Sequence, residues 1–221
     1  MRRAGRRFDR GMFPGYSDAT SAPAETPRPA HPSARPDAVE ALRLMLAGNH
    51  RYTIGAMTSP RGPRARAERV AHPYAVVVGC TDGRVPVEAV FDQREGAVCV
   101  VRSAGHVVDR AVLGSVEFVV AELGVALVMV LGHEDCLAVA RAVTAGRRLD
   151  GNLGYLWTQI APSIVDAPRD AGALWPTIRR HVARTVLTLA QAPQIAPAVR
   201  AGRVRVVGAT YYLDSGRVEV L

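Results

Sequence analysis

Residues 109–132 read "DRAVLGSVEFVVAELGVALVMVLG", a segment of helix length followed at once by an apolar run of strand length. Asp109 is placed to cap that helix. Comparable apolar runs occupy residues 74–79, 97–102 and 203–209. Continuous apolar strands separated by helices are typical of a parallel sheet that is covered on both faces. The sequence therefore predicts an α/β domain with a mostly parallel central sheet flanked by helices.

Both ends of this pattern carry further signals. The last eleven residues, "YYLDSGRVEVL" (211–221), predict a turn at residues 214–216 and an antiparallel edge strand after it. Ahead of the first strand, Asp37 can cap a helix over residues 38–49, which Gly48 would end.

Composition bounds the number of domains. The chain has 221 residues, of which 48% are hydrophobic, and this suits one domain with a substantial core. We expect residues 37–221 to form that single domain. Residues 1–36 are rich in arginine, proline and alanine, so we expect a disordered extension there. No apolar run reaches membrane-spanning length, and the N-terminus lacks the apolar core of a secretory signal. We therefore expect a cytoplasmic protein without a membrane partner.

The net charge of +8 raises the question of nucleic acid. All 28 basic residues are arginine, and half of the excess charge falls within the first 36 residues. Such uniformity indicates a coding bias rather than a selected binding face. Aromatic residues for base stacking make up only 5% of the chain, and no RNA-binding signature is present. The sequence thus predicts no nucleic-acid partner.

Two predicted strands end on metal-ligating side chains. The first runs out at Cys80, and the third runs out at His133, with Cys136 three residues later. Ligands of open α/β sheets gather beyond the carboxyl ends of the strands. If the two strands are neighbours, these three side chains face one another. Two thiolates and one imidazole suit tetrahedral zinc, and three protein ligands with an open fourth position are typical of a catalytic zinc site.

A carboxylate and a guanidinium follow directly after Cys80. Asp82 is a candidate fourth ligand, and Arg84 can hold the same carboxylate in a bidentate pair. Coordination of the metal by Asp82 would close the site. Pairing with Arg84 would leave room for a water whose pKa the metal lowers. The two residues together are therefore candidates for a catalytic dyad and for a switch.

These five residues resemble the motif of the β-class carbonic anhydrases, Cys-x-Asp-x-Arg followed further along the chain by His-x-x-Cys. Other stretches match the family in order and spacing, among them "ALRLMLAGNHRYTIG" (41–55), "VVRSAGHVVD" (100–109) and "VVGATYYLDSGRVEVL" (206–221). The resemblance covers about residues 37–221 and leaves out the N-terminal 36 residues.

The resemblance implies that Cys80, His133 and Cys136 bind zinc and that Asp82 and Arg84 form the catalytic dyad. It also implies reversible hydration of carbon dioxide to bicarbonate and a proton, with hydroxide generated by zinc attacking carbon dioxide in a small apolar pocket. A homo-oligomer, either a dimer or a tetramer, is implied as well.

Leu137 departs from the family, which usually has glycine directly after the second zinc cysteine. A side chain at this position would crowd the crevice, because glycine commonly marks close backbone approach. Leu137 therefore leaves open one alternative, a catalytically silent zinc-binding scaffold of the same fold. A second alternative is a hydrolase that uses the same zinc scaffold on another small linear substrate such as carbon disulfide or carbonyl sulfide.

The remaining candidates have weaker signals. Cys99 lies within an apolar run and is expected in the core. His106 either lines the site as a proton shuttle or has a packed structural role. His181 is expected to cap or pair on a helix face, and Arg102, at a strand end, to be an ion-pair anchor or a pocket cation.

Overall fold

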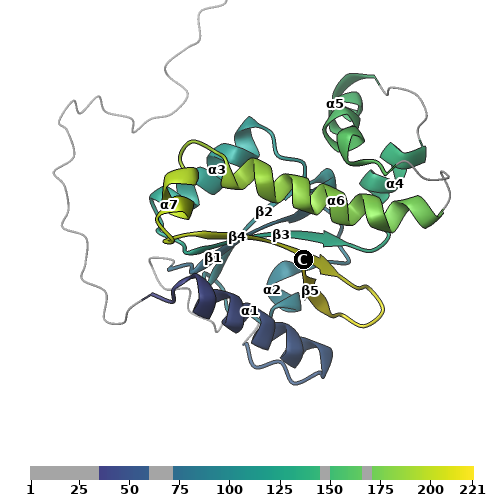
Figure 1. Ribbon diagram of the computed structural model, residues 1–221. Helices are drawn as coiled ribbons and strands as arrows, with labels where there is room; N and C mark the ends of the chain where they lie inside the picture. Colours follow the sequence, from purple (N-terminus) through teal and green to yellow (C-terminus); the bar gives the residue numbers. More distant parts are fainter. Residues whose placement is uncertain (1–34, 60–71, 145–149, 166–170) are drawn as a thin grey trace, which may run out of the picture. The chain divides into compact units, whose positions relative to one another are not determined.

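The computed structural model describes residues 35–59, 72–144, 150–165 and 171–221 (Figure 1). Its centre is a five-stranded sheet in the order β2-β1-β3-β4-β5. The first four strands are parallel, and β5 pairs with β4 in the antiparallel direction. The prediction of a mostly parallel sheet with an antiparallel edge strand is therefore confirmed. The strands are β1 (Ala75–Cys80), β2 (Val98–Ser103), β3 (Leu127–His133), β4 (Arg205–Tyr211) and β5 (Val218–Val220).

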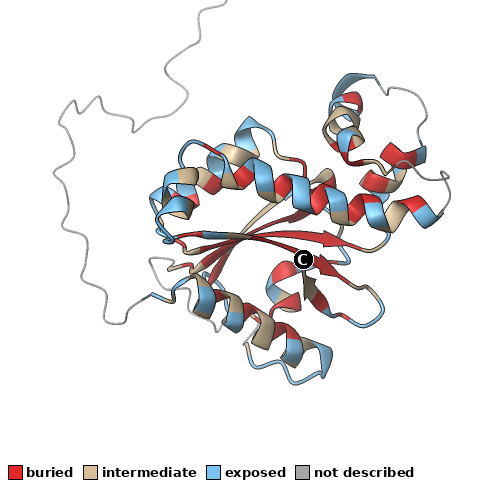
Figure 2. Cartoon of the chain, in the orientation of Figure 1, coloured by how far each residue is buried: buried red, intermediate tan, exposed pale blue. Residues whose placement is uncertain are grey.

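Every residue of β1 and β3 is buried, which explains their unbroken apolar sequences (Figure 2). Successive side chains of a strand point to opposite faces of the sheet. Val77 accordingly packs with Met45 and Phe91 on one face, whereas Val76 and Val78 join a separate cluster on the other. The central strands thus divide the core into two layers.

Helices cover both faces of the sheet (Figure 1). The first face is covered by α1 (Ala38–Thr53) and α2 (Val87–Val90), and the second by α3 (Arg110–Ala121), α6 (Ala171–Ala190) and α7 (Ala196–Arg200). Two further helices pack near the start of α6, beyond the end of β3: α4 (Leu137–Thr144) and α5 (Gly151–Ile160). Two short 3₁₀ turns complete this region, η1 (Ala104–His106) and η2 (Ala161–Ser163). None of the described helices is long and apolar enough to cross a bilayer.

The predicted end of the first helix is wrong. Asp37 does cap α1, because its carboxylate accepts from the amides of Val39 and Glu40, but the helix continues past Gly48 to Thr53. A Cβ atom at position 48 would lie 1.8 Å from the carbonyl oxygen of Phe91. Glycine is therefore required here for close approach to the chain after α2 rather than as a helix stop.

The four predicted parallel strands lie within two residues of the observed ones, and the helix predicted after Asp109 ends at Ala121. Asp109 caps α3 through the amide of Val112. The turn before the edge strand is present, at residues 213–215, one residue earlier than predicted. Residues 1–34 lie outside the described part, so the disordered extension expected over residues 1–36 stays a prediction.

Candidate metal centre and active site

The candidate site lies where the chain order of the sheet reverses. From β1 the connection runs to β2 on one side, and β3 then pairs with β1 on its other side. Such a switch point opens a crevice beyond the carboxyl ends of the strands. Cys80 is the last residue of β1, His133 is the last of β3, and Cys136 directly precedes α4. The condition that the first and third strands are neighbours is met.

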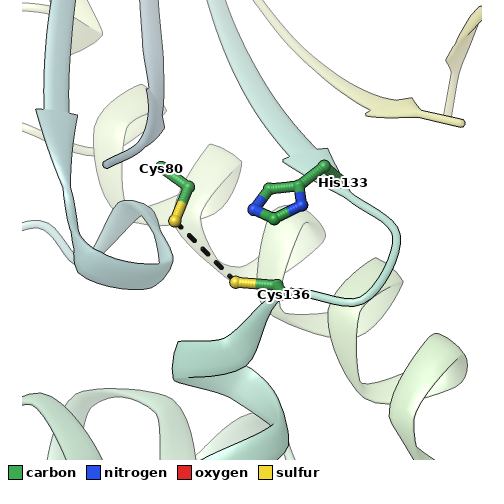
Figure 3. A group of neighbouring side chains, drawn as sticks. All are labelled: Cys80, His133 and Cys136. Atoms are coloured by element: carbon green, nitrogen blue, oxygen red, sulfur yellow. Dashed lines mark hydrogen bonds between the residues drawn. The ribbon is translucent and has the colours of Figure 1, made fainter. Parts of the chain in front are cut away.

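The three side chains point toward one another (Figure 3). The Sγ atoms of Cys80 and Cys136 are 3.9 Å apart, and the donor atoms of the three residues all lie within 4.8 Å of one another. Two sulfur ligands of a tetrahedral zinc, each about 2.3 Å from the metal, would be separated by about 3.8 Å. All three residues are buried. The group therefore has the composition and spacing to hold a metal ion.

The orientation of the His133 ring fits the same interpretation. Its Nδ1 atom lies 2.7 Å from the carbonyl oxygen of Glu134, and because a carbonyl only accepts, Nδ1 carries the proton. The lone pair of Nε2 then faces the two thiols. Nε2 is buried and has no hydrogen-bond partner among the described residues. Buried polar atoms are normally satisfied, and a histidine that donates through one nitrogen is typical of a metal ligand on the other.

The two thiols interact electrostatically. The Cys136 thiol donates to Cys80 and lowers the pKa of Cys80; burial opposes this, and the amide of Gly105, 3.3 Å from the Cys80 Sγ atom, reinforces it. The same contact raises the pKa of Cys136. The protein alone therefore favours one thiolate and one thiol. A bound dication would favour release of the remaining proton, because metal ligation requires thiolates.

Asp82 and Arg84 form a close ion pair beside the cysteines. The distances are 2.7 Å from Arg84 Nη2 to Asp82 Oδ2 and 3.0 Å from Arg84 Nε to Asp82 Oδ1. The guanidinium, helped by the Arg84 amide, lowers the pKa of Asp82 to about 2 despite partial burial. Asp82 Oδ2 lies 4.0 Å from His133 Nε2, so an ionised carboxylate borders the donor group. Of the two expected arrangements of Asp82, the structure has the one paired with Arg84.

Arg102 also contacts the segment from Cys80 to Asp82, but it binds backbone carbonyls there rather than a carboxylate. Its Nε atom donates to the carbonyl of Cys80 at 2.6 Å, and its Nη2 atom donates to the carbonyl of Asp82. Gly79 and Arg102 are register partners on neighbouring strands, which brings the guanidinium to this backbone. The sequence predicted a cation at this strand end. It did not predict the hydrogen bonds of Arg102, because the directions of the two carbonyls depend on the fold.

A cavity of about 560 Å³ opens beside Cys80 and Asp82. Its walls come mainly from apolar side chains of α4 and α5, namely Leu137, Ala138, Ala142, Leu153, Leu156, Trp157 and Ile160. Leu137 lines this cavity, but the residue remains 66% exposed. The leucine is therefore directed largely to solvent rather than packed onto the buried cysteines.

The other candidate residues lie away from this cavity. Cys99 is only partly buried and packs against the layer of α3. His106 is buried and stacks on His181, with ring centroids 4.5 Å apart. Burial, with a contribution from His181, holds the pKa of His106 well below its usual range. The packed structural role is the one that the structure supports for His106.

Fold and site together define an α/β protein with a buried Cys-His-Cys group able to hold a metal at the switch point of its sheet. Residues 75–218 match the family model described as carbonic anhydrase. Carbonic anhydrase 2 of Mycobacterium tuberculosis is 40% identical over 189 residues, which cover 81% of this chain and 90% of the relative. The chain belongs to the β-class carbonic anhydrases, a family of carbonate dehydratases.

Solved structures agree on the fold. A β-carbonic anhydrase of Coccomyxa aligns with a TM-score of 0.65 at 21% identity and covers 71% of this chain and 75% of its own. A β-carbonic anhydrase of Sordaria macrospora, described as tetrameric, aligns with a TM-score of 0.64 at 22% identity, covering 72% of this chain and 84% of its own.

Proposed function

We propose that the protein is a zinc-dependent carbonic anhydrase that hydrates carbon dioxide reversibly to bicarbonate and a proton. Cys80, His133 and Cys136 would hold the zinc, and Asp82 with Arg84 would form the catalytic dyad. The observation that carries the proposal is the buried Nε2 atom of His133, which has no hydrogen-bond partner in the described part of the chain and faces two thiols 3.9 Å apart. Membership of the family supports the same chemistry.

The three ligands would supply two thiolate sulfurs and one neutral imidazole nitrogen. When bound, zinc contributes Lewis acidity, which makes hydroxide accessible near neutral pH for attack on carbon dioxide. The carbonyl of Glu134 holds the His133 ring in the required tautomer, and the amide of Gly105 supports the Cys80 thiolate.

Asp82 would accept a hydrogen bond from the attacking group and so aim it at the substrate carbon. Arg84 keeps this carboxylate ionised and fixed, and it is itself anchored by the carbonyl of Asp135 at 3.2 Å. Because the pKa of Asp82 is lowered to about 2, the carboxylate is a poor proton acceptor near neutral pH. Its role is therefore orientation rather than proton transfer.

The apolar wall of the cavity suits carbon dioxide, which has no charge and no hydrogen-bond donor. Leu156, Trp157 and Ile160 line the cavity together with Cys80. Apolar walls with a few polar groups at one end are usual for small-molecule sites. The substrate would rest on this wall, beside Cys80 and Asp82.

We further propose that the chain self-associates as a dimer or tetramer. The tetrameric relative supports this, as do exposed apolar side chains such as Val39 and Ile54 at the two ends of α1. The cytoplasmic location and the absence of a nucleic-acid partner stay predictions.

The direct test is stopped-flow hydration of carbon dioxide at about pH 8.5 on protein of known zinc content, with the pH set well above neutrality so that hydroxide is accessible. We expect rapid turnover by the wild type and a loss of about 100-fold in Asp82→Asn and in Arg84→Ala, with zinc content unchanged. Glu40→Gln is the matched control, because Glu40 forms a comparable pair with Arg43 on α1.

If Asp82→Asn and Arg84→Ala turn over carbon dioxide as fast as the wild type, the assignment of Asp82 and Arg84 is refuted. A zinc-loaded wild type without carbon dioxide hydration would favour one of the two alternatives. Hydrolysis of carbon disulfide or carbonyl sulfide by the same sample would identify the alternative substrate, and its absence would identify the silent scaffold.

A further inference from the structure

His181 is a buried residue of α6 that contacts the backbone next to the candidate metal site. Its side chain is 3% exposed. The Nε2 atom lies 3.0 Å from the carbonyl oxygen of Gly105, and the Nδ1 atom lies 3.0 Å from the hydroxyl oxygen of Ser163. Both ring nitrogens are therefore used, although His181 contacts neither the cavity nor the three proposed ligands.

The partners fix the state of the ring. Because the Gly105 carbonyl only accepts, Nε2 must carry a proton, and in the neutral ring Nδ1 then accepts from the Ser163 hydroxyl. Burial, partly opposed by the Gly105 carbonyl, lowers the pKa of His181 to about 4, so the ring is neutral at physiological pH. Ser163 is itself fully buried. The pair forms a rigid donor aimed at one carbonyl.

Gly105 connects this donor to Cys80. Its φ and ψ angles are 62° and 28°, in the left-handed region that favours glycine. Its amide donates to the Cys80 Sγ atom at 3.3 Å. A Cβ at this position would lie 3.1 Å from Ile160 Cδ1 and 3.3 Å from Ala138 Cβ, so the residue is also tightly enclosed.

The next residue is held by the same ring. His106 also has a positive φ angle, 46°, which is unfavourable for a residue with a side chain. Its imidazole stacks on that of His181, with centroids 4.5 Å apart and an interplanar angle of 24°. His181 thus supports two consecutive left-handed residues, one through a hydrogen bond and the other through ring contact.

We propose that His181 is a positioning residue of the metal centre, which acts through the carbonyl of Gly105 to keep the Gly105 amide aimed at the Cys80 sulfur. An N–H···S bond withdraws electron density from a thiolate and fixes its direction, as outer hydrogen bonds do for metal ligands generally. His181 would therefore set how strongly Cys80 donates to the metal. The inference rests on the proposed zinc site.

The test uses the full-length protein with Co²⁺ in place of zinc, because sulfur-to-cobalt charge-transfer absorption reports the electron density on the thiolates. His181→Phe keeps an aromatic ring against His106 but removes the donor. We expect the band to move to lower energy, because the Cys80 thiolate regains electron density. We expect the Co²⁺ to be held about 10-fold less tightly in chelator competition, because the direction of the sulfur is no longer fixed. His181→Gln keeps an N–H donor, so we expect its band position and its Co²⁺ affinity to lie between those of His181→Phe and the wild type.

Thr177→Val is the matched control. Thr177 is fully buried one turn before His181 on α6, and its hydroxyl accepts from the amide of Val165. This change removes a partly buried hydrogen bond made by the same helix without touching Gly105. We expect lower thermal stability with an unchanged charge-transfer band. An equal band shift in Thr177→Val would mean general loosening and would overturn the inference.

The remaining outcomes separate this inference from the proposed function. A wild type that shows no sulfur-to-cobalt band would refute the metal site itself. A normal wild-type band that is identical in His181→Phe would refute the role of His181 alone. If His181→Phe does not fold, Ser163→Ala decides, because it removes the hydroxyl that holds Nδ1 and so lets the ring tilt away from the Gly105 carbonyl. An unshifted band in that variant would overturn the inference.

Discussion

Leu137 follows Cys136 directly and is the first residue of α4. Because the residue is 66% exposed, we expect Leu137→Gly to change kcat/KM for carbon dioxide by less than about 3-fold. This is well below the effect of displacing a group that orients the reaction. Stability should fall by about 1 kcal/mol, because glycine is a poor helix former. Leu153→Gly is the control, because Leu153 lines the same cavity from α5 and is 65% exposed. A rise of 10-fold or more in Leu137→Gly alone would mean that leucine crowds the site.

The residues at the site differ in how far their roles could be predicted. Cys80 and His133 were accessible from sequence because each ends an apolar strand, and strand ends in such sheets are where ligands bind. The contact between the Gly105 amide and Cys80 could not be predicted, and neither could the contacts of Arg102 with two carbonyls. Both depend on the direction of the backbone in the folded chain. His181 was expected on a helix face, but its partner Gly105 lies 76 residues away in sequence.

Asp92 joins two elements on the α1 face of the sheet. Its carboxylate accepts from Arg51 Nε at 2.6 Å, near the end of α1, and from the amides of Thr58 and Ser59 in the segment that follows. Asp92 itself lies just after α2. Burial alone would raise the pKa of Asp92, but the amides, Arg51 and the Thr58 hydroxyl outweigh it and hold that pKa well below its usual range.

Asp92→Asn should lower the free energy of unfolding by roughly 2–3 kcal/mol near pH 7, because it leaves the charge of Arg51 without its partner; the partial exposure of Arg51 keeps the loss below that of a fully buried pair. Asparagine tolerates the positive φ angle of 45° at this position, so the change isolates the charge. The measurement is denaturant unfolding of wild type and variant across pH.

The pH dependence has a definite sign. The pKa is lower in the folded state, so the stabilisation is complete above the unfolded value of about 3.9 and is lost as pH falls from there toward the folded value. The difference between wild type and Asp92→Asn should therefore be constant at neutral pH and shrink below about pH 4. A difference that stays constant down to pH 3 would contradict the account.

Strands and helices could be predicted where a single sequence pattern, such as an apolar run, marked them clearly. The four parallel strands are apolar runs bounded by polar residues and were predicted within two residues. The end of α1 was not, because a glycine inside a helix and a glycine that ends one look the same in sequence. Gly48 is explained only by the carbonyl of Phe91 against which it packs.

At the scale of the whole molecule, we expect a homo-oligomer. Light scattering after size-exclusion chromatography should give a mass of two or four times 23.6 kDa at micromolar concentration. Val39→Glu combined with Ile54→Glu places charges on the exposed apolar positions of α1 and should reduce that mass. A wild type that remains monomeric would refute the proposed self-association.

The order of the strands in the sheet could not be predicted from the sequence. Cys80 and His133 meet only because β1 and β3 pair, and the sequence specified strands without specifying neighbours. Side-chain chemistry could be predicted at each strand end, whereas the site itself is a consequence of topology.

The measurement that tests the central claim most directly is zinc K-edge X-ray absorption of the purified, active protein. Coordination by Cys80, Cys136 and His133 predicts two sulfur scatterers at about 2.3 Å and two nitrogen or oxygen scatterers at about 2.0–2.1 Å, one from the histidine and one from a non-protein ligand. Cys136→Ser should remove one sulfur from that shell. A shell of four sulfurs, or one without sulfur, would contradict the account.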